Sequence, residues 1–140
     1  MEKIDSALIS AYQALALKHS DGSDIGTAYP NMHFDPLDAL WIAVVNVPVT
    51  DDAVTLGDMG ADEITGYFQI AISAPIESGT SEIARLRGLI REGMKIGFGV
   101  TYQGQTVTYI HRRFPPIMPN GAYAVGVIQI YWRARTNRSN

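Results

Sequence analysis

The sequence predicts an α+β fold in which helices flank a mainly antiparallel or mixed sheet. Residues 64–74 alternate apolar and polar side chains, with Phe68 and Ile72 on one face, as in a half-buried strand. Residues 83–94 then repeat apolar side chains at helical spacing. Short links between further strands favour antiparallel pairing. The helix before residues 100–112 can instead serve as a crossover, which would make the sheet mixed.

The N-terminal third is expected to contain one helix and one buried strand. An apolar stripe predicts a helix over residues 2–18. Residues 25–38 contain two prolines and are expected to be irregular, with a short extended piece over residues 29–34 as the alternative. The β-branched and aromatic run at residues 40–47 predicts a buried strand that Pro48 ends.

The middle of the chain is expected to carry an arm, a strand and a second helix. Residues 50–63 form either a loop or a long hairpin arm in front of the strand at residues 64–74. Pro75 ends that strand, because proline has no N–H for the ladder. The segment Ser78–Glu82 supplies N-cap oxygens and an acid for the first turn of a helix that runs to Lys95.

The C-terminal third is expected to be mostly extended. Residues 100–111 predict a hairpin that turns at Gln103-Gly104. Three prolines make residues 114–121 a stiff loop, and residues 122–133 are the longest strand candidate. Residues 134–140 are polar and basic, and we expect them to form a flexible tail.

The length and composition favour a single domain over residues 1–133 of the 140-residue chain. The chain has no cysteine, which excludes disulfides, thiolate zinc sites and cysteine nucleophiles. Glu2, Lys3 and Asp5 interrupt any apolar signal peptide, and the apolar run at residues 39–45 is too short to span a bilayer. We therefore expect no contact with a membrane.

Charge is divided unevenly along the chain. Residues 1–82 hold 13 acidic residues and two lysines, whereas residues 83–140 hold one acid and nine lysines and arginines. One interpretation is that the two halves neutralise each other inside the fold. The other is that each monomer has an acidic and a basic side and packs head-to-tail with the next copy in a ring.

Four features together resemble the tail terminator, or tail completion, proteins of long non-contractile phage tails. They are the N-terminal helix, the strand at Leu40–Val44, a central block of short motifs, and the C-terminal strand at Tyr123–Trp132. The central block consists of Thr55-Leu-Gly57, Gly66-Tyr-Phe-Gln-Ile70, Ala74-Pro75 and Gly79. The resemblance extends over most of the chain, from Ile4 to Trp132.

The resemblance implies a structural protein that forms a ring, usually a hexamer, on the end of the tail tube. Such a ring stops tube polymerisation and gives the head a surface to join. The implied partners are other copies of the chain, the tail tube protein and a head–tail connector or neck protein. DNA would pass through the lumen without sequence-specific binding. The implied location is the neck end of the virion tail, after assembly in the host cytoplasm, and neither a cofactor nor catalysis is implied.

Two other functions remain alternatives at this point. The chain could be a different neck, connector or minor tail protein with the same small fold. It could also be a small ligand-binding or enzymatic α+β domain, which a deep apolar pocket with converging polar groups would favour. The sequence has no hydrolase, phosphate-loop or zinc-protease motif, so we predict no catalytic residue and no metal ligand.

Basic residues supply the first candidate interface. Arg87, Arg91 and Lys95 recur at four-residue intervals on the predicted second helix. They form either a solvated helix edge or a basic ridge that meets acids of a neighbouring subunit. Arg112 and Arg113 end a strand, and we interpret them as a charge cluster at a subunit edge. Nucleic-acid contact is less favoured, because the chain is acidic overall.

Acidic residues supply the second candidate interface. The segment before the central strand carries Asp51, Asp52, Asp58, Asp62 and Glu63. Their spacing does not match a calcium loop, so an exposed loop is the ordinary interpretation. The resemblance favours an arm that touches the tube or a neighbouring subunit.

Two tyrosines, Tyr67 and Tyr131, supply the third candidate interface. Each belongs to a predicted strand whose alternate face carries the more apolar residues. Tyrosine is enriched at protein interfaces, so we predict that both are interface anchors.

Overall fold

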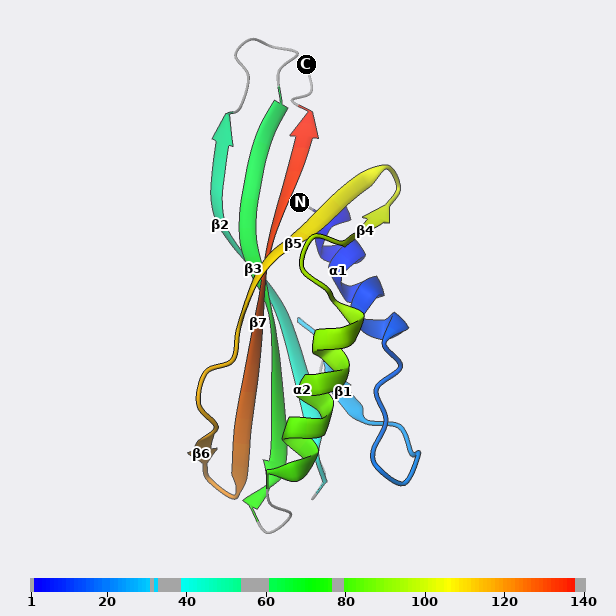
Figure 1. The fold of residues 1–140 in the computed structure, drawn as a ribbon, viewed down its shortest axis with the longest axis vertical. Helices are drawn as coiled ribbons and strands as arrows, with labels where there is room; N and C mark the ends of the chain where they lie inside the picture. The colour runs from blue at the N-terminus through cyan, green and yellow to red at the C-terminus, as the bar shows by residue number, and fades with distance from the viewer. Residues whose placement is uncertain (1, 31, 33–38, 54–60, 77–79, 138–140) are drawn as a thin grey trace.

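Figure 1 shows a curled, twisted sheet with both helices on one of its faces. The computed structural model describes residues 2–30, 32, 39–53, 61–76 and 80–137. The elements are, in chain order, α1 (Glu2–Ala14), β1 (Gly26–Ala28), β2 (Trp41–Ala53), β3 (Ala61–Pro75), α2 (Ser81–Gly93), β4 (Gly99–Tyr102), β5 (Gln105–Arg113), β6 (Met118–Asn120) and β7 (Tyr123–Asn137). The predicted α+β class is therefore confirmed.

The sheet is mixed, with mainly antiparallel pairs. Its strands lie in the order β1-β2-β3-β7-β5-β4, and β6 pairs with β7 outside this path. β1 runs parallel to β2, whereas the other described pairs are antiparallel. Because β7 is antiparallel to both β3 and β5, those two strands run in the same direction. The chain between them, including α2, is thus the crossover that the sequence allowed.

Pro48 does not end its strand, contrary to the sequence prediction. β2 pairs with β3 along its full length to Ala53, and the register shifts between Pro48 and Thr50. A bulge at this point accommodates a residue that has no N–H for the ladder, and the strand continues beyond it. The described part of residues 50–63 is therefore a hairpin arm.

β7 also extends past its predicted end. It pairs with β3 from Tyr123 to Asn137, and the Ala134 side chain is only 3% exposed. The expected tail at residues 134–140 is therefore wrong for residues 134–137, which continue the strand. Residues 138–140 lie outside the described residues.

Two short strands occupy segments that were expected to be irregular. β1 lies within residues 25–38, and β6 lies within the predicted loop at residues 114–121. Each has three residues and pairs with a much longer strand. The longer strand supplies the backbone partners, so the sequence of the short segment carries little signal of its own. Of the alternative extended piece at residues 29–34, residues 31, 33 and 34 lie outside the described residues.

The helices differ from prediction at their ends. α1 ends at Ala14, and Ala16 has a φ of 49°, a left-handed conformation that does not continue a helix. α2 begins at Ser81 after Thr80, whose side chain makes no capping hydrogen bond. Glu82 supplies the predicted acid of the first turn. Ser78 lies outside the described residues.

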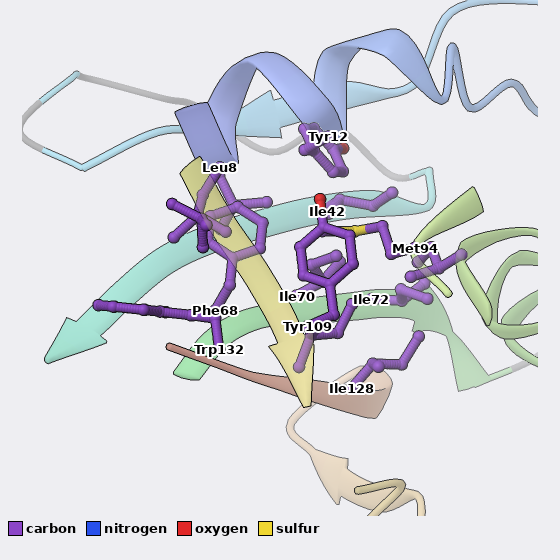
Figure 2. Packing of buried hydrophobic residues seen from close by; sticks show 14 of the residues in the cluster. Leu8, Tyr12, Ile42, Phe68, Ile70, Ile72, Met94, Tyr109, Ile128 and Trp132 are labelled. Atoms are coloured by element: carbon purple, nitrogen blue, oxygen red, sulfur yellow. The ribbon is translucent and has the colours of Figure 1, made fainter. Parts of the chain in front are cut away.

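The core fills the space between the helices and one sheet face, as Figure 2 shows. The predicted face of β3 is buried, including Phe68, Ile70 and Ile72. From β7, Ile128 and Trp132 join it. The predicted apolar stripe of α2 is buried along its length, and the α1 stripe is buried from Ile4 to Tyr12. These helix residues are Ile83, Leu86, Ile90 and Met94, with Ile4, Leu8 and Tyr12.

Candidate interaction surfaces

Arg87 is turned toward its own chain. Its Nη2 atom donates hydrogen bonds to the carbonyl oxygens of Pro115 (2.8 Å) and Val127 (2.9 Å). Its guanidinium also lies 5.9 Å from the centre of the Phe114 ring. Burial lowers the pKa of Arg87, although an arginine stays charged at neutral pH. Arg87 therefore ties α2 to β7 and to the segment after β5.

Arg112 caps the C-terminal end of α2. Its Nη1 atom donates hydrogen bonds to the carbonyl oxygens of Arg91 (2.8 Å) and Met94 (3.4 Å). These carbonyls belong to the last turn, where helical partners are missing and a positive charge is favourable. Burial and the nearby charge of Arg91 lower the pKa of Arg112. The side chains of Arg91, Lys95 and Arg113 remain exposed.

One acidic residue of the arm, Glu63, lies beside a basic residue of β7. Glu63 is opposite Arg135 in the β3–β7 ladder, and the Oε2 and Nε atoms of the two side chains are 4.0 Å apart. Within the ladder of β2 and β3, Asp52 is opposite Glu63. The charge asymmetry of the sequence is thus partly neutralised within one chain.

The other arm residues differ in their exposure. Asp51 is exposed and Asp62 is half-buried, whereas Asp58 lies outside the described residues. Among the residues that the structure describes, no three potential ligands gather into a metal site.

Tyr67 and Tyr131 meet on the sheet face that points away from the helices. They are register partners on β3 and β7, and their ring centres are 5.4 Å apart. His111 of β5 lies beside them, 5.5 Å from the Tyr131 ring centre. Next to the tyrosines on the same face, the side-chain amide of Gln129 donates a hydrogen bond to Gln69 at 3.1 Å. The two predicted anchors therefore form one half-buried aromatic group at the centre of this face.

A groove between α1 and β2 was not predicted. We call it the α1–β2 groove, and its volume is about 490 Å³. Most of its lining is apolar, and Asp5 is the charged residue among the lining side chains. The lining residues are Asp5, Ile9, Gln13, Tyr29, Pro30, Met32, Val44, Val45, Asn46 and Phe68.

The polar groups of this groove are bonded to one another. Trp132 Nε1 donates to Asn46 Oδ1 at 2.9 Å, and Asn46 Nδ2 donates to Asp5 Oδ1. Asp5 and Asn46 are 41 positions apart, so no local sequence pattern signals their contact. The amide and the carboxylate thus fix α1 against β2 rather than converge on an empty position.

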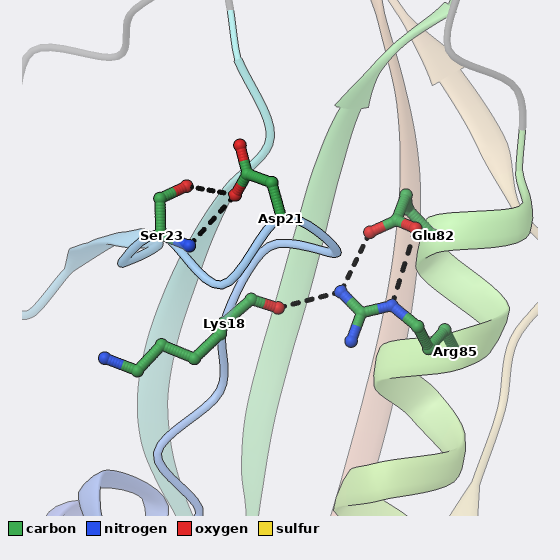
Figure 3. Close-up of polar contacts among 5 residues, drawn as sticks. All are labelled: Lys18, Asp21, Ser23, Glu82 and Arg85. Atoms are coloured by element: carbon green, nitrogen blue, oxygen red, sulfur yellow. Dashed lines mark hydrogen bonds and ion pairs between the residues drawn. The ribbon is translucent and has the colours of Figure 1, made fainter.

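Polar contacts also fix the segment after α1 to the start of α2 (Figure 3). Arg85 Nη2 donates to the carbonyl of Lys18 at 2.7 Å and pairs with Glu82 at 2.8 Å. The hydrogen bond from Arg85 holds the pKa of Glu82 below its ordinary value. Asp21 accepts hydrogen bonds from the backbone and hydroxyl of Ser23, and these lower its pKa.

Comparison with known proteins agrees with the resemblance found in the sequence. A family model described as phage tail terminator protein matches residues 3–132. One solved structure resembles the chain with a TM-score of 0.67 at 14% identity, covering 92% of this chain and 94% of the other. At that identity the likeness shows the fold alone. No curated protein matches the chain. Neither described helix is long and apolar enough to cross a membrane.

Proposed function

Because this chain belongs to the phage tail terminator family, we propose that it caps the tail tube as a ring, stops tube polymerisation and presents the surface for head joining. Membership of the family supports a structural role in the phage tail, as a component of the virion. The proposed partners are other copies of the chain in a hexamer, the tail tube protein and a head–tail connector protein. DNA would pass through the lumen without being read.

The observation that carries this proposal is one end of the sheet, where the hairpin arm pairs with the end of β7. In Figure 1 the upper ends of β2, β3 and β7 extend past both helices. The exposed residues at this end of the sheet include Thr50, Asp51 and Arg135. An exposed end of three paired strands offers side chains of both charges to a large partner.

The proposal is tested by polymerising purified tail tube protein with and without this chain and measuring tube lengths by electron microscopy. Substoichiometric protein should shorten the tubes and label one end. Asp51→Arg should weaken this effect, because it reverses an exposed charge of the arm. The matched control is Asp24→Arg, a reversal of an exposed acid in the segment after α1, which should leave capping unchanged.

Tubes that grow to the same length with and without the protein would contradict the capping role. Binding to connector protein without any binding to tube ends would instead favour the neck-protein alternative. Native mass spectrometry across salt concentrations tests the ring itself, with a salt-sensitive closed oligomer as the expected result.

A further inference from the structure

Phe98 is exposed on a backbone that is firmly held. Its side chain is 69% exposed, and it stands between Gly97 and Gly99. Gly97 N donates to the carbonyl of Tyr109 at 2.8 Å, and Tyr109 N donates to the carbonyl of Phe98 at 2.8 Å. Phe98 N donates to the carbonyl of Lys95 at 3.2 Å. We call residues Lys95–Gly99 the Phe98 corner.

Both glycines of the corner are required by its geometry. Gly97 has a φ of +88°, which other residues rarely adopt. A Cβ atom on Gly99 would lie 1.9 Å from the carbonyl oxygen of Val107, so only glycine permits this approach of the backbone to β5. Isolated exposed apolar residues are common and need no explanation. Here, however, the fold uses two constrained glycines to hold an aromatic side chain out in solvent, beside the exposed Ile96 and Ile110.

The Phe98 corner and the α1–β2 groove lie toward opposite edges of the sheet. The corner leads directly into β4, the last strand at one edge, whereas the groove lies along β2 near the other. Their chemistry is complementary. The corner and the last turn of α2 carry Arg91 and Lys95 against one acid, Glu92, and the charged residue that lines the groove is Asp5.

We propose that Phe98 of one copy inserts into the α1–β2 groove of the next copy, so that successive subunits join head-to-tail. This contact rests on the proposed function, since it supplies the subunit interface of the ring. An apolar projection that fits a pocket elsewhere on the same molecule makes a heterologous contact, which repeats into a ring when the rotation closes. Rigid aromatic side chains that fill pockets carry much of the binding energy of interfaces. Lys95 then approaches Asp5 of the neighbouring copy and sets the register.

The contact is tested with two variants that each remove one side of it. Phe98→Asp removes the projection, and Gln13→Trp fills the groove from an exposed helix position. Each variant alone should associate at least tenfold more weakly than the wild type in native mass spectrometry. An equimolar mixture should form heterodimers, because the intact groove of one variant accepts the intact Phe98 of the other. Met118→Asp, at an exposed apolar position outside both surfaces, is the matched control and should assemble normally.

Association is measured in solution. If the wild type assembles only on tail-tube ends, association is measured on those ends. Circular dichroism confirms that each variant is folded, and Phe98→Ser replaces Phe98→Asp if the latter is not. Wild-type assembly by either variant, or a mixture that stays monomeric, would overturn the contact and leave the capping role intact. A wild type that assembles neither in solution nor on tube ends would overturn the proposed function together with the contact.

Discussion

Gly66 of β3 lies directly against the indole ring of Trp132. A Cβ atom at Gly66 would lie 2.8 Å from Cζ2 of that ring and 2.5 Å from the carbonyl oxygen of Val47. The two residues are register partners in the β3–β7 ladder, on the face that the helices cover. The missing side chain of Gly66 is therefore what allows the largest buried side chain of the core to lie against the backbone of β3.

Gly66→Ala should destabilise the protein by about 1–3 kcal/mol, because the added methyl group must displace either an indole ring or backbone. The measurement is the free energy of unfolding in denaturant. Gly88→Ala is the matched control, since nothing lies within 4 Å of a Cβ atom there. It should stabilise the protein by about 0.5–1 kcal/mol, as in an open helix position. Equal effects of the two substitutions would show that the packing of Trp132 on Gly66 is not tight.

Asn46→Leu should also destabilise the fold. Leucine keeps the branched shape of asparagine but leaves the indole N–H of Trp132 and the Asp5 carboxylate without their partner. A buried donor that loses its partner, as the N–H of Trp132 would, costs about 1–3 kcal/mol. Denaturant unfolding with tryptophan fluorescence measures both the stability and the environment of the ring. Gln69→Leu breaks a neutral side-chain hydrogen bond on the opposite sheet face, and this control should cost no more than about 1 kcal/mol.

Arg87→Met should cost about 1.5–3 kcal/mol, because it removes charge-assisted hydrogen bonds to the carbonyls of Pro115 and Val127. Arg91→Met, on the same helix but exposed, should change the stability by no more than about 0.5 kcal/mol. Thermal unfolding of the two variants gives the comparison. If Arg91 proved the more costly of the two, the inward position of Arg87 would be wrong.

The ion pair of Glu82 should make part of the stability depend on pH. The hydrogen bond from Arg85 lowers the pKa of Glu82 in the folded state below its ordinary value of 4.5. The unfolded chain therefore takes up this proton first as the pH falls. The contribution of this ion pair to stability is present above pH 4.5. It is lost as the pH falls through the lowered pKa of Glu82. Glu82→Gln and Arg85→Gln should each flatten the acid side of a plot of Tm against pH, and an unchanged slope in both would rule this contribution out.

The sequence predicts the faces of the elements well because each face repeats over many residues. Phe68, Ile70 and Ile72 recur at every second position and are all buried, as are the four apolar residues of the α2 stripe. The hairpin turn is likewise local, since Gln103 and Gly104 both have positive φ angles, as its two turn positions need. These features depend on residues that are close together in the chain, so they can be predicted from a single sequence.

What the sequence does not predict depends on partners far along the chain. Arg87 and Arg91 look equivalent on a helix, yet the carbonyl that turns Arg87 inward belongs to Val127, 40 positions away. Similarly, the charge asymmetry left two interpretations open, neutralisation within the fold or an acidic and a basic side. The β3–β7 register that places Glu63 opposite Arg135 joins residues 72 positions apart, so no local pattern signals it. The predicted role of the basic and acidic residues in subunit contacts stays a prediction.

The position of β7 has a consequence for how the protein is made. β7 is synthesised after the other described strands, yet it lies in the interior of the sheet, between β3 and β5. Until Tyr123–Asn137 has been synthesised, β3 lacks a partner on one side and β5 has only the short β4 beside it. Pairing of such distant segments is slow, and unpaired strand edges are prone to aggregation. Completion of the sheet therefore depends on synthesis of β7, so a chain that stops before Tyr123 lacks the folded surfaces that assembly needs.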